Sequence, residues 1–277
     1  MMRKYVTLSS SSSPASVGCS NSIAMVCVSR WKTSSAAANE KFKKRMEERL
    51  RIESEVKSKC AQFPHRILTR PAAALDVKAI RHQTFMHHVV ALTKMAAQVN
   101  AISFCGQKGH WDARVVIMKS NPDMKEFEVW VNPEVAGYDD RNSVAPMYGM
   151  WENCASCGAA SAWVVRPQSI QVQGYDEYGN EKKEVLNGIR ARLMMHELDH
   201  LQGKTIIQQA LGPDFVVSQS ALAQKDLWAA NFPSAEAHMT APMQFFDYVT
   251  NQTIVPPGFE WYFLHMMQQQ FSDLRIK

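Results

Sequence analysis

Two histidines one helical turn apart near residue 200 constrain this 277-residue chain more than any other feature of its sequence. The run His196-Glu197-Leu198-Asp199-His200 has the spacing that places both imidazoles on one face of a helix, where they can bind the same metal ion. The glutamate beside the first histidine can exchange a proton with a water that the metal activates. Because so short a match also occurs on ordinary surface helices, the flanking residues decide its meaning.

The flanking sequence predicts one buried helix that carries the motif. Ile189, Leu193, His196 and His200 are spaced three or four residues apart, as on one helical face. Gly203 stands where a glycine commonly follows the end of a helix. A single buried histidine is usually a hydrogen-bonded core residue, but two of them one turn apart, with a glutamate between, favour a metal site.

A catalytic site of this kind needs a third protein ligand. In one protease class this ligand is a histidine six residues after the second, and here that position is Ile206. In another class it is a glutamate about twenty residues downstream, but the next glutamate after Glu197 is Glu236. The upstream segment 151–157, Trp-Glu-Asn-Cys-Ala-Ser-Cys, offers a cysteine instead.

These two segments together resemble the motifs of the peptide deformylase family. Residues 196–203, His-Glu-Leu-Asp-His-Leu-Gln-Gly, are similar to the third motif, His-Glu-x-Asp-His-Leu-x-Gly. Residues 152–156, Glu-Asn-Cys-Ala-Ser, are similar to the second motif, Glu-Gly-Cys-Leu-Ser. The resemblance implies one divalent ion, Fe²⁺ or Zn²⁺, held by Cys154, His196 and His200, with Glu197 as general base and acid.

The first motif of the family, Gly-x-Gly-x-Ala-Ala-x-Gln, is matched best at residues 92–98. Leu92 and Lys94 stand in the two glycine positions, and Gln98 arrives one residue early. In the family this glutamine donates a hydrogen bond to the developing oxyanion. The resemblance therefore assigns that role to Gln98, together with the backbone N–H of Ala155, which replaces the leucine of the second motif.

The resemblance implies that the substrate is an N-formyl-methionyl peptide and that hydrolysis releases formate. Two alternatives stay open. The changed first motif motivates a catalytically weak or inactive paralogue, kept as a metal-binding or interaction protein. Lys94 and Ala155 motivate a metallohydrolase of the same fold that acts on another amide.

The N-terminal 39 residues predict import into an organelle. They contain four basic residues, no acidic residue and dense serine, which is typical of a transit peptide. A disordered low-complexity tail is the alternative. The apolar patch within this N-terminal segment, residues 23–28, is too short to span a membrane. Combined with the resemblance, this composition predicts a mitochondrial protein, with the plastid as alternative.

Charge and cysteine content narrow the function further. Without residues 1–39 the chain keeps 27 basic residues against 26 acidic ones, and this near-neutral balance gives no support to nucleic-acid binding. The six cysteines follow no disulfide spacing, which indicates a reducing compartment. Cys157 forms a C-x-x-C pair with Cys154, but no second pair exists to complete a structural zinc site, and we expect Cys157 to be a small buried thiol.

The remaining patterns predict an α+β fold, with antiparallel β-sheets packed around a central helix that carries the histidine motif. We expect a helix over residues 76–97 and extended structure at 67–71, 114–119, 127–132, 162–166 and 169–175. The predicted organisation is a transit peptide at 1–39, a charged helical linker at 40–63, a deformylase-like catalytic domain at 64–210 and a C-terminal extension at 211–277.

The C-terminal extension is rich in aromatic residues and methionine. We expect most of these side chains to pack against the body of the protein, and residues 259–272 to form a terminal helix. A partner surface, for the ribosome or for a second subunit of a homodimer, is the alternative.

Overall fold

The computed structural model describes residues 40, 44, 60–121, 124–138, 146–257 and 259–260. From Cys60 onward the described residues belong to one compact unit, Arg51–Lys277. The expected transit peptide, most of the expected linker and nearly all of the expected helix at 259–272 lie outside the described residues. Among the residues that are described, no helix combines the length and apolarity needed to cross a membrane.

The fold is α+β with antiparallel sheets, as the sequence predicted, and the described residues form two such sheets of five strands each. The first sheet has the order β1-β2-β3-β6-β7, and the second has the order β10-β9-β4-β5-β8. The strands of the first sheet are β1 (Ser103–Cys105), β2 (Val115–Met118), β3 (Glu128–Tyr138), β6 (Ser169–Tyr175) and β7 (Glu181–Asn187). The strands of the second sheet are β4 (Met147–Asn153), β5 (Ala160–Pro167), β8 (Val216–Ser218), β9 (Phe245–Asp247) and β10 (Gln252–Ile254).

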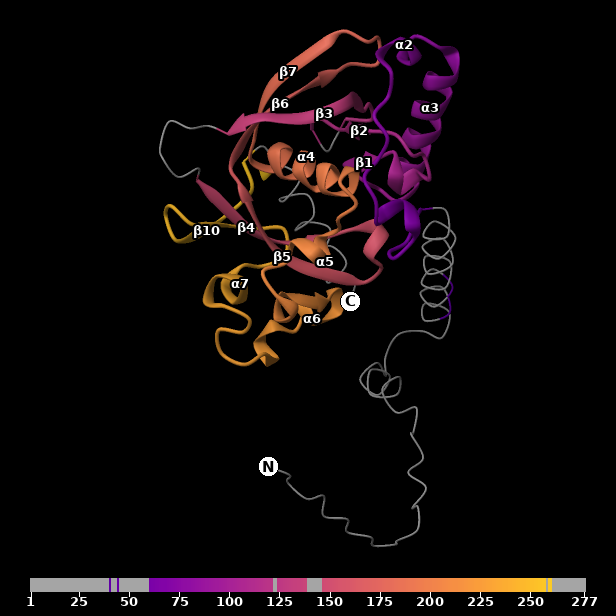
Figure 1. Ribbon diagram of the computed structural model, residues 1–277. Coiled ribbons are helices and arrows are strands. Elements are labelled where there is room, and N and C mark those ends of the chain that lie inside the picture. The colour runs from indigo at the N-terminus through magenta and orange to yellow at the C-terminus, as the bar shows by residue number, and fades with distance from the viewer. Residues whose placement is uncertain are drawn as a thin grey trace, which may run out of the picture. The chain divides into compact units, whose positions relative to one another are not determined.

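Helix α4 (Gly188–Leu201) lies between the two sheets (Figure 1). It contacts β1, β2, β6 and β7 on one side and β5 on the other. Residues on nearly every face of α4 are buried, as expected for a helix enclosed by other elements. Four of these buried residues are polar, namely Arg192, His196, Glu197 and His200. Buried polar side chains need partners, so this helix is where a functional site is expected.

Helix α4 ends just before Gly203, as the sequence predicted. Its last residue is Leu201, and Gly203 adopts a φ of 78°. A Cβ at Gly203 would lie 2.6 Å from the backbone nitrogen of Arg70. The position therefore requires glycine for both its backbone conformation and its close contact.

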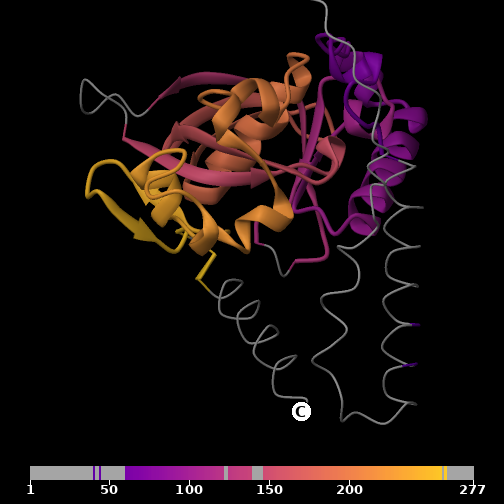
Figure 2. The same ribbon diagram turned by 90° about the horizontal axis from the view of Figure 1, so that it is seen from below.

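Helix α3 (Gln83–Gln98) covers the far end of the first sheet, and the short helix α2 (Val77–Ile80) precedes it. The buried residues of α3 are Phe85, Val89, Leu92 and Ala96, which are spaced so that they form one stripe along the helix. The single helix predicted over 76–97 is thus two helices, because the chain turns at Arg81 and His82. Figure 2 shows α3 in purple and the C-terminal strands in yellow on opposite sides of α4.

Two expectations near the start of the folded unit need correction. The extended entry predicted at 67–71 contains the end of a 3₁₀ turn, η1 (Arg66–Leu68), in which Ile67 and Leu68 are buried. Cys60 and Ala61 are also buried, and neither is helical, so the packed core begins before residue 64.

The segment after residue 210 is part of the body. It supplies β8, β9 and β10, and therefore three of the five strands of the second sheet. Two short elements, α5 (Ile206–Gln209) and η4 (Pro213–Phe215), lead from α4 to β8, and three more lie between β8 and β9: α6 (Gln219–Leu222), η5 (Lys225–Leu227) and α7 (Ala235–Met239). Within this segment Trp228 packs against Trp151 of β4. The described part of the extension thus packs as the aromatic composition predicted.

Candidate metal centre

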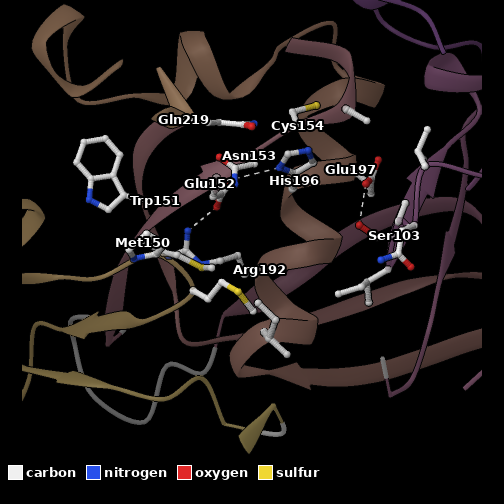
Figure 3. Close-up of a pocket in the computed structure, with 18 of the residues that line it drawn as sticks. Ser103, Met150, Trp151, Glu152, Asn153, Cys154, Arg192, His196, Glu197 and Gln219 are labelled. Carbon is white, nitrogen blue, oxygen red and sulfur yellow. Dashed lines mark hydrogen bonds and ion pairs between the residues drawn. The ribbon is translucent and has the colours of Figure 1, made fainter. Parts of the chain in front are cut away.

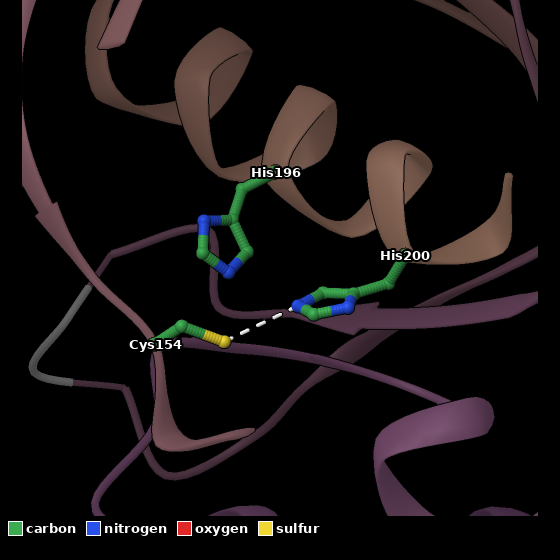
Figure 4. A group of neighbouring side chains, drawn as sticks. All are labelled: Cys154, His196 and His200. Atoms are coloured by element: carbon green, nitrogen blue, oxygen red, sulfur yellow. Dashed lines mark hydrogen bonds between the residues drawn. The ribbon is translucent and has the colours of Figure 1, made fainter. Parts of the chain in front are cut away.

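Three side chains from two elements converge in the middle of the molecule (Figure 4). His196 and His200 project from α4, and Cys154 follows β4 at the start of the 3₁₀ turn η3 (Ala155–Cys157). The ligand atoms of all three residues lie within 4.8 Å of one another. The sulfur of Cys154 lies 3.2 Å from Nε2 of His200. The structure therefore brings together the three residues that the sequence predicted as ligands.

These donors fit a tetrahedral divalent ion. One thiolate and two imidazoles form a ligand set used by Zn²⁺ and Fe²⁺, and two ligands of such an ion are roughly 3.5 Å apart. His196 Nδ1 lies 3.0 Å from Oε2 of Glu152. Because Glu152 is ionised and can only accept, Nδ1 carries the proton and Nε2 is left for the metal.

Cys154 is held as a thiolate. The thiol of Cys157 donates a hydrogen bond to its sulfur, and this bond, with help from the two histidines, outweighs burial and lowers the pKa of Cys154 well below its usual range. The backbone N–H of Ser156 also points to the sulfur, at 3.4 Å. Cys157 is half-buried rather than fully buried, and its part is to donate to the predicted ligand. The four described cysteines form no disulfide with one another.

A buried ionic network holds Glu152 in place. Arg166 donates to both carboxylate oxygens of Glu152, at 2.7 and 3.0 Å, and to Asp199 at 2.7 Å. Arg192 donates to Glu152 as well (Figure 3). Burial alone would raise the pKa of Glu152, but the charges of Arg166 and Arg192 hold it well below its usual range. The network therefore orients His196 through an anion that stays charged.

Glu197 is completely buried, and two donors hold one of its oxygens. Ser103 Oγ lies 2.7 Å and Lys108 Nζ 2.8 Å from Oε1. The other oxygen, Oε2, has no hydrogen-bond partner among the described residues. Burial favours the protonated acid, but the charge of Lys108 outweighs it and the pKa of Glu197 falls below its ordinary value. Lys108 is 3% exposed and its pKa is raised, because attraction to Glu197 outweighs its burial.

A cavity of about 650 Å³ opens over this cluster. Cys154, His196 and Glu197 line it, as do Ser103 and Lys108. Another part of its lining is apolar and comes from distant segments of the chain: Met150, Ile189, Leu222, Pro242, Met243 and Phe259. The cavity therefore combines a polar floor with an apolar wall to which residues beyond 210 contribute.

Comparison with known proteins decides the family. The sequence model described as "Polypeptide deformylase" matches residues 57–214, more than half of the chain. The chain belongs to the polypeptide deformylase family. The relatives include peptide deformylase 2 of Nostoc sp., 29% identical over 140 residues, which cover 48% of this chain and 75% of the relative. They also include the peptide deformylase of Pseudomonas aeruginosa, 28% identical over 153 residues, which cover 53% and 82%.

Solved deformylase structures share the α+β fold. A peptide deformylase from Legionella pneumophila matches with a TM-score of 0.50 and 21% identity, over 56% of this chain and 86% of that one. A variant of Arabidopsis thaliana peptide deformylase 1B matches with a TM-score of 0.51 and 21% identity, over 60% and 86%. These likenesses establish the fold of the deformylases for this chain.

The two residues predicted to bind the oxyanion lie at the edge of the deformylase pocket. Gln98 is the last residue of α3; it is exposed and lines the cavity. Ala155 is half-buried in η3 and also lines the cavity, while its carbonyl accepts a hydrogen bond from Gln62. The role of Gln98 and of the Ala155 N–H stays a prediction.

The structure favours another position for the first deformylase motif. Leu92 and Lys94, placed in its glycine positions from sequence, lie within the regular helix α3. Residues 101–108, Ala-Ile-Ser-Phe-Cys-Gly-Gln-Lys, instead lead into the pocket. Small residues stand at the two glycine and two alanine positions of the motif, and Lys108 stands at the position of its glutamine. Ser103 and Lys108 were missed because the sequence comparison required the glutamine itself; the pattern of small residues would have found them.

Proposed function

We propose that this chain removes the N-formyl group from formyl-methionine at the N-terminus of polypeptides made inside an organelle. The observation that carries the proposal is the convergence of Cys154, His196 and His200 on one point of a deformylase fold, beside a pocket that Cys154, His196 and Glu197 line. Membership of the deformylase family, which hydrolyses a formyl amide, supports the same reaction.

Cys154, His196 and His200 would hold one Fe²⁺ or Zn²⁺ ion. When bound, this ion supplies Lewis-acid polarisation of the formyl carbonyl and activation of water. Glu197 has one carboxylate oxygen without a partner among the described residues, and that oxygen is suited to take up a proton and return it to the departing amine. The N–H of Ala155 would donate to the oxyanion; Gln98 lines the same pocket, but the position of the motif's glutamine is taken by Lys108.

The apolar wall of the cavity suits a methionine side chain. Met150, Ile189 and Phe259 offer thioether, aliphatic and aromatic surface, to which an unbranched thioether adapts well. Burying such a side chain contributes about 1.5–3 kcal/mol. We therefore propose that formyl-methionine is recognised here.

We also propose that residues 1–39 direct the protein to the mitochondrion, with the plastid as alternative. Support comes from their basic, serine-rich and acid-free composition. Fusing residues 1–39 to a fluorescent protein tests this, and fluorescence that stays spread through the cytosol would exclude both organelles as destinations of this segment.

Formate release from a formyl-Met-Ala-Ser peptide tests the activity. The full chain, loaded with Fe²⁺ without oxygen, is compared with Glu197→Gln at equal metal content. We expect release by the wild type and its loss in the variant. A wild-type protein that holds one metal ion per chain and releases no formate would contradict the proposal.

The alternative function, a catalytically weak paralogue that binds metal, also has an observation in its favour. Lys108 neutralises the charge of Glu197 through a buried ion pair. An ion-paired carboxylate is a weaker base than a free one. The two functions differ in what happens when this ion pair is removed.

A further inference from the structure

We infer that Lys108 is a positioning residue for Glu197: together with Ser103 it fixes one carboxylate oxygen by hydrogen bonds, so that the other oxygen faces the reaction. The inference rests on the proposed deformylase function, because it assigns Glu197 to proton transfer. Lys108 thus supports proton transfer by Glu197 in this chain and does not suppress it.

The first step of the argument is the asymmetry of the Glu197 carboxylate. Both donors, Ser103 Oγ and Lys108 Nζ, bond to Oε1, at 2.7 and 2.8 Å. Oε2 is buried and has no partner among the described residues. A carboxylate with two donors on one oxygen cannot rotate freely, so the proton-accepting oxygen has one orientation.

The second step is the rigidity of the element that carries Lys108. It lies in the 3₁₀ turn η2 (Gln107–Gly109), directly after β1. The amide of Gln107 donates to the backbone carbonyls of Ile67 and Arg70, both at 2.7 Å. The carbonyl of Lys108 accepts from the N–H of Ala61 at 2.9 Å. The turn is therefore tied down on both sides of the lysine.

The third step is charge. Lys108 Nζ also lies 4.8 Å from the centre of the Phe104 ring. The side chains of Lys108 and Glu197 are both buried. Each charge is buried only because the other compensates for it. Lys108 and Cys154 line the same pocket, so the lysine adds a cation beside the predicted metal ligands.

Kinetics of Lys108 variants test the inference with the Fe²⁺-loaded full chain and formyl-Met-Ala-Ser. We expect Lys108→Met to lower kcat about 100-fold while KM changes less than about threefold, as for a misplaced catalytic group. Lys108→Gln keeps an N–H donor and should recover at least about tenfold of that loss. Lys183→Met, on the exposed side of β7, is the matched control and should retain wild-type rates.

Two kinetic results would overturn the inference. A kcat of Lys108→Met within about threefold of wild type would make the ion pair purely structural. A kcat that rises in Lys108→Met or Lys108→Gln would show that the lysine quenches the base, as in a weak paralogue.

A double-mutant cycle measured by thermal unfolding tests the same contact without an activity assay. Lys108→Met should lower Tm by about 5 °C or more, because it leaves Glu197 charged, buried and uncompensated. Lys108→Met/Glu197→Gln should regain at least half of that shift. Strictly additive shifts would refute the contact and the inference with it. If the wild type released no formate while the two substitutions were still coupled, the deformylase function would be refuted. The positioning role would then be refuted with it, and only the ion pair between Lys108 and Glu197 would stand.

Discussion

Glu152 accepts a hydrogen bond from Nδ1 of His196 at 3.0 Å while two arginines hold its charge. The predicted metal ligand is thus oriented by a carboxylate that α4 does not itself supply. β4 carries Glu152 and leads directly into Cys154, two residues later. One strand and the turn that follows it therefore provide a ligand and the group that orients another ligand.

Replacing Glu152 should weaken metal binding. We expect Glu152→Gln to lower the affinity for Zn²⁺ about 10- to 100-fold, because an amide cannot hold the proton on Nδ1 of His196 as firmly. Competition with a chromophoric chelator measures the affinity. Glu134→Gln, on the exposed side of β3, is the control. An affinity equal to that of the control would show that His196 is oriented by other contacts.

The same carboxylate should make stability depend on pH. The pKa of folded Glu152 lies well below 4.5, the ordinary value for a glutamate. Its contribution is fully present above that value and is lost as the pH falls towards the folded pKa. For metal-free protein, the difference in unfolding free energy between wild type and Glu152→Gln should therefore shrink from about pH 6 to about pH 3.5. Urea unfolding measures it, and a constant difference would contradict the prediction.

Cys157 should affect the ligand thiolate. Cys157→Ala removes the donor to Cys154, so the thiolate loses its main stabilisation and protons compete better with the metal. We expect the affinity for Zn²⁺ at neutral pH to fall on the order of tenfold, and Cys157→Ser to retain most of it. Chelator competition at several pH values checks this. Equal affinities of the alanine variant and the wild type would exclude a role for the donor.

The helix-terminating glycine should be irreplaceable. Gly203→Ala combines a positive φ with a clash against the Arg70 backbone, and we expect a loss of roughly 3 kcal/mol in unfolding free energy. Gly158→Ala has a positive φ but open space, so roughly 1 kcal/mol is expected. Gly137→Ala has neither problem and should be neutral. Chemical denaturation ranks the three variants, and a different order would contradict the explanation.

Phe259 should contribute to substrate binding. Phe259→Ala removes part of the apolar wall, so KM for formyl-Met-Ala-Ser should rise about 5- to 30-fold while kcat stays within about threefold. Steady-state formate release measures both constants. An unchanged KM would place the methionine side chain elsewhere in the cavity.

The sequence predicted the features that depend on local spacing. The two histidines and the glutamate lie within one turn or two of α4, and the glycine that follows the helix lies two residues past its end, so their relation follows from helix geometry. Cys154 could be predicted because the second motif surrounds it. The antiparallel α+β fold followed from strand-like segments clustered ahead of that helix.

The burial of Lys108 and its contact with Glu197 could not be predicted in the same way, although the pattern of small residues marks its position. A lysine beside a glycine in a short turn normally lies in solvent, and nothing local indicates burial. Its partner, Glu197, is 89 residues away, and only the packing of η2 against α4 brings them together. Strand β4 was likewise not predicted as a strand; it pairs with the neighbouring β5 on one edge, and its pairing with β9 on the other depends on residues distant in the chain.

The pairing of β4 with β9 joins residues that are synthesised far apart in time. Tyr148 and Gly149 pair with Asp247 and Phe246, about one hundred residues later in the chain. A nascent chain that has reached only residue 210 already contains every predicted ligand, yet the edge of the strand that leads to Cys154 still lacks this neighbour. The second sheet therefore gains its last strands only after every predicted ligand has been synthesised.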